Sequence, residues 1–524
     1  MVKKKLLPLG IQNFRELRNK NCVYVDKTED IHRLVTEGWY YFLSRPRRFG
    51  KSLMLSTLKE LFSGSRELFE GLWIENNWDW SKSNPVVHIS FATMPYQGLG
   101  LEKAISLELD NYGLQYGIIF SQNDIKSKFL ELLKGIHAQK GKVIFLVDEY
   151  DKPIIDYLEY EKLSKAREHQ EIMKTFYSVL KDNEEYLEFV LITGVSKFSK
   201  VSIFSDLNHL TDITLFDDFA VTFGYTEEEI VKNFEPYLLE CEAKFKMSRE
   251  ELLLEMKAMY NGFSWDAVHK VYNPFGTLSF FKAQDFHNFW FATGTPTFLV
   301  QLIEKQVKFD FENTETTTSS IDKYSLDNLD LISLLFQTGY LTIKERNYRT
   351  GYILLDYPNR EIRESMYNFM INSLKQRKSE ASAQEVVRHL TLAFQQNDLE
   401  RIKDLMETMF GDLPHNLFEE DDKRSERFYH SIIHLVFKFL GVYIDSEVRT
   451  SKARADSVVQ TATHVYIFEF KYRETAEAAF EQIISRNYVQ KYIASEKTII
   501  GIGVNFDKEE RSIDGWKAEI LVAK

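Results

Sequence analysis

The stretch that most constrains this chain is an apolar run, residues 40–43, that ends in a basic turn. The turn, residues 45–52, reads Arg-Pro-Arg-Arg-Phe-Gly-Lys-Ser, and apolar residues at helical spacing follow it over residues 53–62. This pattern predicts a strand, a loop and a helix. A loop in that position collects unpaired N–H groups and the positive end of the helix dipole, so we expect it to bind an anion.

The end of the turn carries the residue types that phosphate binding needs. Gly50 lets the backbone approach a phosphate, Lys51 reaches the outer phosphates, and the Ser52 hydroxyl can bind Mg²⁺. The usual pattern has glycine at the position of Arg45, and the arginines here bring charge where glycine brings flexibility. A basic helix cap is the alternative interpretation. The residues expected to contact nucleotide in this turn are Arg45, Arg48, Phe49, Gly50, Lys51 and Ser52.

Composition predicts several folded domains in a reducing compartment. The chain has 524 residues, 44% hydrophobic and 14% aromatic, and we expect domains over residues 1–225, 226–375 and 376–524. The two cysteines, Cys22 and Cys241, exclude a disulfide framework and a four-cysteine zinc site. The apolar runs are too short or too polar for a signal peptide or a membrane span, so we expect a soluble, cytoplasmic protein with no membrane partner.

The charge is acidic overall and excludes a general basic field for nucleic acid. The formal net charge is −12, and residues 420–524 are nearly neutral, with 16 Lys and Arg against 17 Asp and Glu. Any nucleic-acid surface must therefore be local.

A second strand with two terminal carboxylates is the expected partner of the basic turn. Five apolar residues, 143–147, predict a central parallel strand buried on both faces, and Asp148 and Glu149 follow it directly. Carboxylates at that end of a strand lie where α/β sheets bind ligands. We expect Asp148 to hold Mg²⁺ and Glu149 to orient the attacking water. A solvated acidic loop is the alternative.

Two further segments are candidate contacts of the nucleotide. Residues 189–192 predict a third strand, which ends in Thr193-Gly194-Val195-Ser196-Lys197; Thr193 there either senses the phosphates or belongs to an ordinary turn. Residues 24–28, which precede the basic turn, either pack on the base or form a purely structural strand and cap.

These segments together resemble a known family. Residues 24–28, 45–52, 147–151 and 193–197 are similar to those of the AAA-ATPase-like bacterial proteins that carry a C-terminal nuclease-like domain. In that family an arginine-rich turn commonly replaces the first glycine of the phosphate loop. Further matches extend the resemblance along nearly the whole chain: residues 260–263, 272–274, 293–296, 337–341 and 357–359. The resemblance implies a P-loop α/β domain, a middle region and a nuclease-like domain.

The middle region predicts a winged-helix-like lobe. Residues 326–336 read as a helix, and residues 340–343 and 352–355 read as a strand and its returning partner. Such a lobe either binds DNA or packs on the ATPase, and we favour packing.

The last hundred residues suggest a second site. Two strands in hairpin order place Asp456 at one strand and Glu469 and Lys471 on the next, where alternation puts these two on one face and Phe468 and Phe470 on the other. Two carboxylates with a nearby lysine can hold Mg²⁺ and direct water to phosphorus. An exposed strand of alternating charge is the alternative.

This second pattern resembles the restriction-endonuclease-like PD-(D/E)XK superfamily. The resemblance implies that Asp456 and Glu469 are metal-binding and catalytic, and that Lys471 is catalytic. Glu426 or Glu447 would be an additional acid, with Gln482, Tyr488 and Tyr492 at accessory positions. We reject a zinc site at His430 and His434, because no zinc-protease signature accompanies them.

The sequence therefore predicts an ATP-dependent or ATP-regulated, Mg²⁺-dependent nuclease. Its expected cofactors are ATP and Mg²⁺, and its expected partners are ATP and DNA or RNA. A homo-oligomer is compatible, because an arginine supplied in trans can complete such a site. The alternatives are a nucleotide-controlled switch that binds nucleic acid with an inactive nuclease fold, and a protein-remodelling ATPase.

Overall fold

The computed structural model describes most of the chain. The described residues are 4–197, 203–204, 207, 209–291, 310–322, 326, 329–374, 382–411, 422–443, 449–450, 457–472, 474–506 and 513–524. They form two compact units, one of Met1–Phe298 with Phe311–Ile362, the other of Leu299–Asp310 with Arg363–Lys524. The three-domain division stays a prediction, and its expected seam at residues 375–380 lies outside the described residues.

A five-stranded parallel sheet forms the base of the first unit. Its order is β2-β3-β4-β1-β5, so the strand before the basic turn lies beside the strand that ends in Thr193 and Gly194. The strands β1 and β3 are buried because helices cover both faces of such a sheet. The strand bounds are β1 Tyr40–Ser44, β2 Val86–Ser90, β3 Val143–Asp148, β4 Leu187–Gly194 and β5 Thr211–Asp212.

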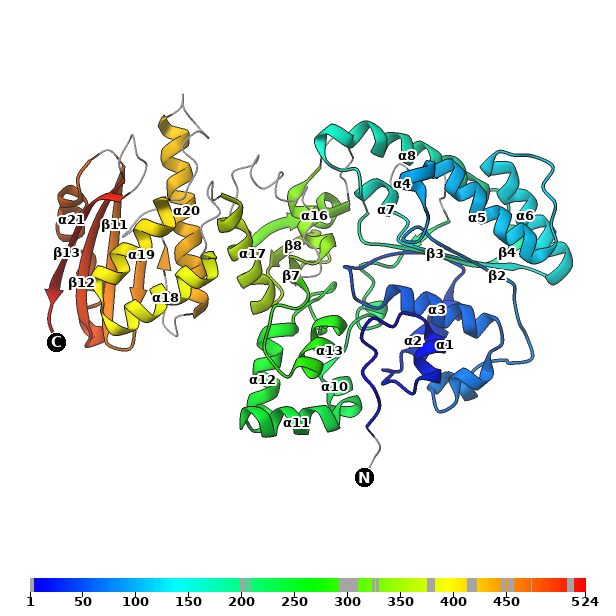
Figure 1. Cartoon of the computed structure of the whole chain (residues 1–524), viewed down its shortest axis with the longest axis horizontal. Coiled ribbons are helices and arrows are strands. Elements are labelled where there is room, and N and C mark those ends of the chain that lie inside the picture. The colour runs from blue at the N-terminus through cyan, green and yellow to red at the C-terminus, as the bar shows by residue number, and fades with distance from the viewer. Residues whose placement is uncertain are drawn as a thin grey trace. The chain divides into compact units, whose positions relative to one another are not determined.

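Helices lie on both sides of this sheet. Figure 1 shows α5, α6 and α8 on one side and α1, α2 and α3 on the other. The helix α5 runs through Gly113 and is capped by Gly117, whose φ is 68°. The bounds are α1 Phe14–Asn19, α2 Thr28–Glu37, α3 Lys51–Phe62, α4 Tyr96–Leu99, α5 Leu101–Tyr116, α6 Ile125–Lys140, α7 Lys152–Ile155 and α8 Leu163–Tyr177.

The rest of the first unit is a helical segment followed by a small lobe. The lobe has an antiparallel sheet of order β6-β8-β7, with α16 before β7, as the winged-helix-like pattern predicts. Its helix starts at Leu331 and not at 326, because Asp330 caps it by accepting from the Ser333 N–H. The bounds are α10 Glu227–Asn233, α11 Glu235–Phe245, α12 Arg249–Tyr260, α13 Pro274–Ala283, β6 Thr314–Thr317, α15 Thr318–Asp322, α16 Leu331–Thr338, β7 Thr342–Arg346 and β8 Tyr352–Asp356.

The second unit is a mixed sheet between helices. Its order is β13-β12-β11-β10-β9, in which β10 and β11 form the antiparallel pair that the sequence predicts and β11 and β12 are parallel. Figure 1 shows α21 on one face and α18, α19 and α20 on the other. The bounds are α17 Arg360–Leu374, α18 Ala383–Gln396, α19 Leu399–Gly411, α20 Asp422–Tyr443, β9 Arg449–Thr450, β10 Ser457–Gln460, β11 His464–Tyr472, α21 Ala476–Ser485, β12 Thr498–Phe506 and β13 Ile513–Val522.

These two sheets confirm the predicted fold class. In the part of the chain that the structure describes, no helix combines the length and the apolar character that a bilayer span requires.

Candidate functional site

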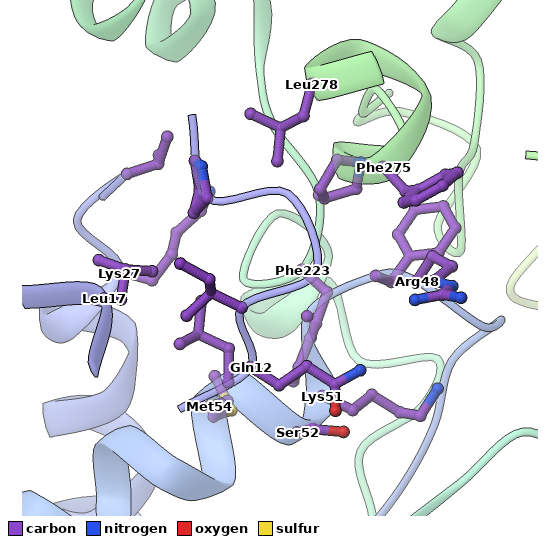
Figure 2. A pocket seen from close by; sticks show the side chains of 18 of the residues that line it. Gln12, Leu17, Lys27, Arg48, Lys51, Ser52, Met54, Phe223, Phe275 and Leu278 are labelled. Carbon is purple, nitrogen blue, oxygen red and sulfur yellow. The ribbon is translucent and has the colours of Figure 1, made fainter. Parts of the chain in front are cut away.

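A pocket of about 400 Å³ lies at the start of α3 in the first unit. The expected residues Arg48, Phe49, Gly50, Lys51 and Ser52 line it, together with Glu149. Figure 2 shows Lys51 and Ser52 on one side of the pocket, and Phe275 and Leu278 on the opposite side. The pocket therefore has a polar side formed by the basic turn and an apolar side formed by α13.

The backbone of the turn is shaped for close approach of a ligand. Gly50 caps the start of α3 with φ of 92°, a left-handed conformation that glycine adopts without steric cost. Arg48 also has positive φ, at 68°. The first N–H groups of α3 have no acceptor within the helix, so the turn presents donors and the positive helix dipole to the pocket.

Lys51 is held in the base of this turn. Its Nζ donates to the carbonyl oxygens of Arg45 at 2.8 Å and Pro46 at 2.9 Å. Burial lowers the pKa of Lys51, and the negative charges of Asp148 and Glu149 oppose that shift. A phosphate would offer this buried ammonium a stronger acceptor than the two carbonyl groups.

Of the two carboxylates at the end of β3, Glu149 lines the pocket, whereas Asp148 and its partner Thr193 are not among the lining residues. Asp148 is buried and accepts a hydrogen bond at 3.2 Å from the Thr193 hydroxyl at the end of β4. Glu149 lines the pocket with φ of 52°, and burial, followed by the charge of Asp148, raises its pKa. These groups, with the Ser52 hydroxyl, are oxygen donors of the kind that Mg²⁺ prefers.

The side chain of Arg45 does not contact this pocket, which departs from its expected role in nucleotide binding. Its guanidinium is fully buried and donates to the carbonyls of Ser44 at 3.0 Å, Thr214 at 2.7 Å and Phe219 at 3.2 Å. Burial lowers the pKa of Arg45 to about 9. Arg45 thus joins β1 to a distant segment, and the basic residues of the turn that line the pocket are Arg47, Arg48 and Lys51.

The apolar side of the pocket comes from segments that sequence reasoning missed. Phe275 and Leu278 lie on α13, and Phe223 lies on the segment before α10. Asn273-Pro274 reads as a turn in the sequence. In the structure Asn273 caps α13 and Pro274 is its first residue, so this pair was the sequence signal for the start of the helix. The Arg48 guanidinium lies 4.9 Å from the centre of the Phe275 ring.

The N-terminal segment also borders the pocket. Residues 8–12 line it, and so do Tyr24, Val25 and Lys27, which places the expected base-packing segment at the pocket. The segment is held on both sides, because Leu6 accepts from the Val23 N–H and the Phe14 N–H donates to Ser56 on α3.

The second candidate site lies on β11 in the second unit. Glu469 is buried and accepts a hydrogen bond from the amide of Gln482 on α21. Phe468 and Phe470 lie on the other face, where both pack against Phe437 of α20, as alternation predicts. Lys471 lies 3.6 Å from a carboxylate oxygen of Glu474.

Asp456, the expected partner of Glu469, lies outside the described residues, and so does Glu447. Ser457, which follows Asp456 in the sequence, pairs with Phe468 across the antiparallel β10 and β11. Among the described residues no three His, Cys, Asp or Glu side chains cluster as metal ligands. His434 donates to the Asp310 carboxylate at 3.0 Å, a contact with one carboxylate.

Gly503 allows the approach of α21 to the sheet. A Cβ atom at this position would lie 2.3 Å from the carbonyl oxygen of Ala476 and 2.6 Å from the amide nitrogen of Phe480. Gly503 pairs directly with Glu469 on β11. The missing side chain therefore brings Gln482 within reach of Glu469.

Comparison with known proteins matches both regions. Residues 8–204 match the family described as "Predicted AAA-ATPase", and residues 424–516 match the PD-(D/E)XK nuclease superfamily. The chain is 37% identical to "Uncharacterized protein in vnfD 5'region" of Azotobacter chroococcum mcd 1, over 99% of each chain. The solved structure of the Aeropyrum pernix ORC1 protein in complex with DNA matches 65% of this chain and 91% of its own, at 11% identity and a TM-score of 0.25, too low to support an inference.

Proposed function

Because the chain belongs to the AAA-ATPase-like bacterial proteins with a C-terminal PD-(D/E)XK nuclease-superfamily domain, we propose that it hydrolyses ATP and uses nucleotide binding to control a Mg²⁺-dependent cut in DNA or RNA. The observation that carries the proposal is the convergence of Lys51, Ser52 and Glu149 on one pocket, with Asp148 at the adjacent strand end. The apolar wall formed by α13 supports a nucleobase as the other half of the ligand.

In the proposed reaction at the first site, Lys51 leaves its carbonyl acceptors and binds the outer phosphates. Ser52 and Asp148 would hold Mg²⁺, which supplies charge neutralisation at the phosphates. Glu149 accepts the proton of the attacking water and orients it. The raised pKa of Glu149 brings this carboxylate closer to neutral pH, which suits a general base.

Point variants test the first site. We expect Lys51→Ala to lose nucleotide binding, because it removes the ammonium that contacts the outer phosphates. Glu149→Gln should retain binding and lose turnover, because the amide cannot accept the proton. The measurements are fluorescent-nucleotide binding and phosphate release, and hydrolysis by Glu149→Gln at the wild-type rate would refute the assigned base.

At the second site, Asp456 and Glu469 would hold Mg²⁺, and Lys471 would orient the water toward phosphorus. Gln482 supports this proposal, because its amide fixes one oxygen of Glu469 and leaves the orientation of the carboxylate defined. The test is cleavage of plasmid and single-stranded substrates with Mg²⁺, compared with Glu469→Ala and Lys471→Ala. Equal cleavage by all three proteins would remove this site from the proposal.

Two other functions remain as alternatives with distinct outcomes. A switch that binds nucleic acid without cutting it would show ATP-dependent binding and no cleavage. A protein-remodelling ATPase would show turnover and no affinity for DNA or RNA at low salt, where charge-driven binding is strongest.

A further inference from the structure

The end of helix α16 contacts two loops of the nucleotide site. Gln337, in the last turn of this helix, accepts a hydrogen bond of 2.6 Å from the backbone N–H of Lys197. Gly339, which ends the helix with φ of 92°, lies so close to Pro46 of the basic turn that a Cβ there would be 2.8 Å from the proline ring. One helical turn of the lobe thus touches both the phosphate loop and the loop after β4.

The end of β4 and the loop after it, residues 193–197, are fixed to the carboxylates of Asp148, at the end of β3, and Asp151, just after it. Asp151 accepts from the N–H of Val195 at 3.1 Å and from the N–H of Ser196 at 2.6 Å. The Ser196 hydroxyl donates to the same carboxylate at 2.7 Å. Since Asp148 accepts from Thr193, a shift of the catalytic carboxylates would be transmitted along this loop to Lys197.

The phosphate loop is tied to the same segment from its other side. The Ser44 hydroxyl donates to the carbonyl of Val195 at 2.5 Å, and the Arg45 N–H donates to the carbonyl of Gly194 at 3.2 Å. Gly194 itself has no room for a side chain, because a Cβ would lie 2.5 Å from the Tyr150 ring. Residues 193–197 are therefore packed between the two halves of the nucleotide site.

Gln337 is oriented for its contact with this loop. Its side chain is buried, and its amide nitrogen donates to the carbonyl of Ile321 on α15 at 3.0 Å. The amide oxygen is thereby turned toward Lys197, whose Nζ pairs with Asp212 at 3.0 Å. Buried polar groups whose hydrogen bonds are satisfied make a structure rigid, so this contact holds α16 and residue 197 in a fixed relation.

We propose that Gln337 is a positioning residue that holds residues 193–197 in register with the phosphate loop and couples nucleotide turnover to the lobe. This inference rests on the proposed ATP hydrolysis. Gln337 touches no substrate, so its loss should slow turnover through Thr193 and Asp148 and leave nucleotide affinity nearly unchanged.

The experiment compares two variants of the full chain. Gln337→Met has similar volume and no hydrogen bond, and Thr338→Val removes a neighbouring hydroxyl that bonds within its own helix. We expect Gln337→Met to lower kcat about tenfold with nucleotide Kd within about twofold, as for the loss of one buried hydrogen bond. Thr338→Val should match the wild type.

Hydrogen exchange gives a readout that does not depend on turnover. In the wild type, ADP should slow exchange in peptides from both the phosphate loop and residues 331–341. In Gln337→Met, the slowing should persist in the phosphate loop and disappear in the lobe.

The outcomes separate the two proposals. A wild type that binds no nucleotide refutes the proposed ATPase. A wild type that binds and hydrolyses ATP, beside a Gln337→Met that keeps both kcat and exchange protection, overturns the role of Gln337.

Discussion

The guanidinium of Arg45 lies over the indole ring of Trp265, with 4.1 Å between the guanidinium carbon and the ring centre. The same guanidinium donates to three backbone carbonyls and has no exposed surface. In Arg45→Met these carbonyls lose their donors inside the protein. We expect a loss of about 2–4 kcal/mol in stability, from several buried groups left unpaired, and a lower thermal midpoint by calorimetry.

Arg47→Met is the matched control for Arg45→Met. Arg47 is exposed and lines the pocket. Its replacement should leave the thermal midpoint unchanged and weaken nucleotide binding, because one cation near the phosphates is removed. If Arg45→Met instead lost nucleotide binding and kept the thermal midpoint of the wild type, Arg45 would have to be a contact of the phosphates.

The hydroxyl of Thr193 provides a second prediction. Thr193→Val keeps the shape of the side chain and removes the donor to Asp148. We expect kcat for ATP hydrolysis to fall about tenfold with little change in nucleotide affinity, because an unrestrained Asp148 positions its ligand less well. Thr391→Val in α18 is the control, since its hydroxyl bonds only to a carbonyl of its own helix in the described contacts. ATP turnover by Thr193→Val at the rate of Thr391→Val and the wild type would exclude this role for Thr193.

The amide of Gln482 is expected to matter for nucleic-acid cleavage. Gln482→Leu removes the donor to Glu469 while the buried carboxylate stays in place. We expect about tenfold slower cleavage and a higher Mg²⁺ concentration for half-maximal rate, as for other residues that orient a metal ligand. Gln490→Leu, an exposed change nearby, should leave both quantities unchanged. Slower cleavage with an unaltered Mg²⁺ requirement would point to a purely structural role.

Asp310 predicts a pH dependence of the second unit. Burial alone would raise the pKa of Asp310, but hydrogen bonds from His434 and Lys438 outweigh it and lower the pKa below its ordinary 3.8. A carboxylate with a lowered pKa stabilises the fold above its unfolded pKa and loses that contribution as the pH falls through the folded value. We therefore expect the thermal unfolding midpoint of this unit to decrease as the pH is lowered below about 4.

Asp310→Asn is the variant for that measurement. It removes the titrating group, so its midpoint at neutral pH should be lower than that of the wild type and should change less with acidification. Parallel pH curves for the two proteins would contradict the assignment.

The sequence predicted those elements and strand faces that depend only on residues close together in the chain. The strand, turn and helix around Lys51 follow from the apolar pattern on each side of a turn that contains Gly50. The buried strand before Asp148 follows from its run of apolar residues. Alternation likewise put Glu469 on the face opposite Phe468 and Phe470, because the period of a strand fixes which side each residue faces.

The remaining features of the candidate site depend on contacts between residues that lie far apart in the sequence. The direction of the Arg45 side chain depends on carbonyls at Thr214 and Phe219, which no local pattern near the basic turn could reveal. The same holds for Phe275, which reaches Arg48 only after the chain has folded back through α13. The family resemblance gave Gln482 only as an accessory position, and its contact with Glu469 depends on the packing of α21 against β11.

The two sides of the pocket, the basic turn and the α13 residues Pro274, Phe275 and Leu278, are separated by more than 220 positions in the chain. During translation the basic turn therefore leaves the ribosome well before α13 has been synthesised. A growing chain that ends before Leu278 has the basic turn and the N-terminal lining of the pocket without its α13 side, so the complete pocket exists only after more than half of the chain has been synthesised.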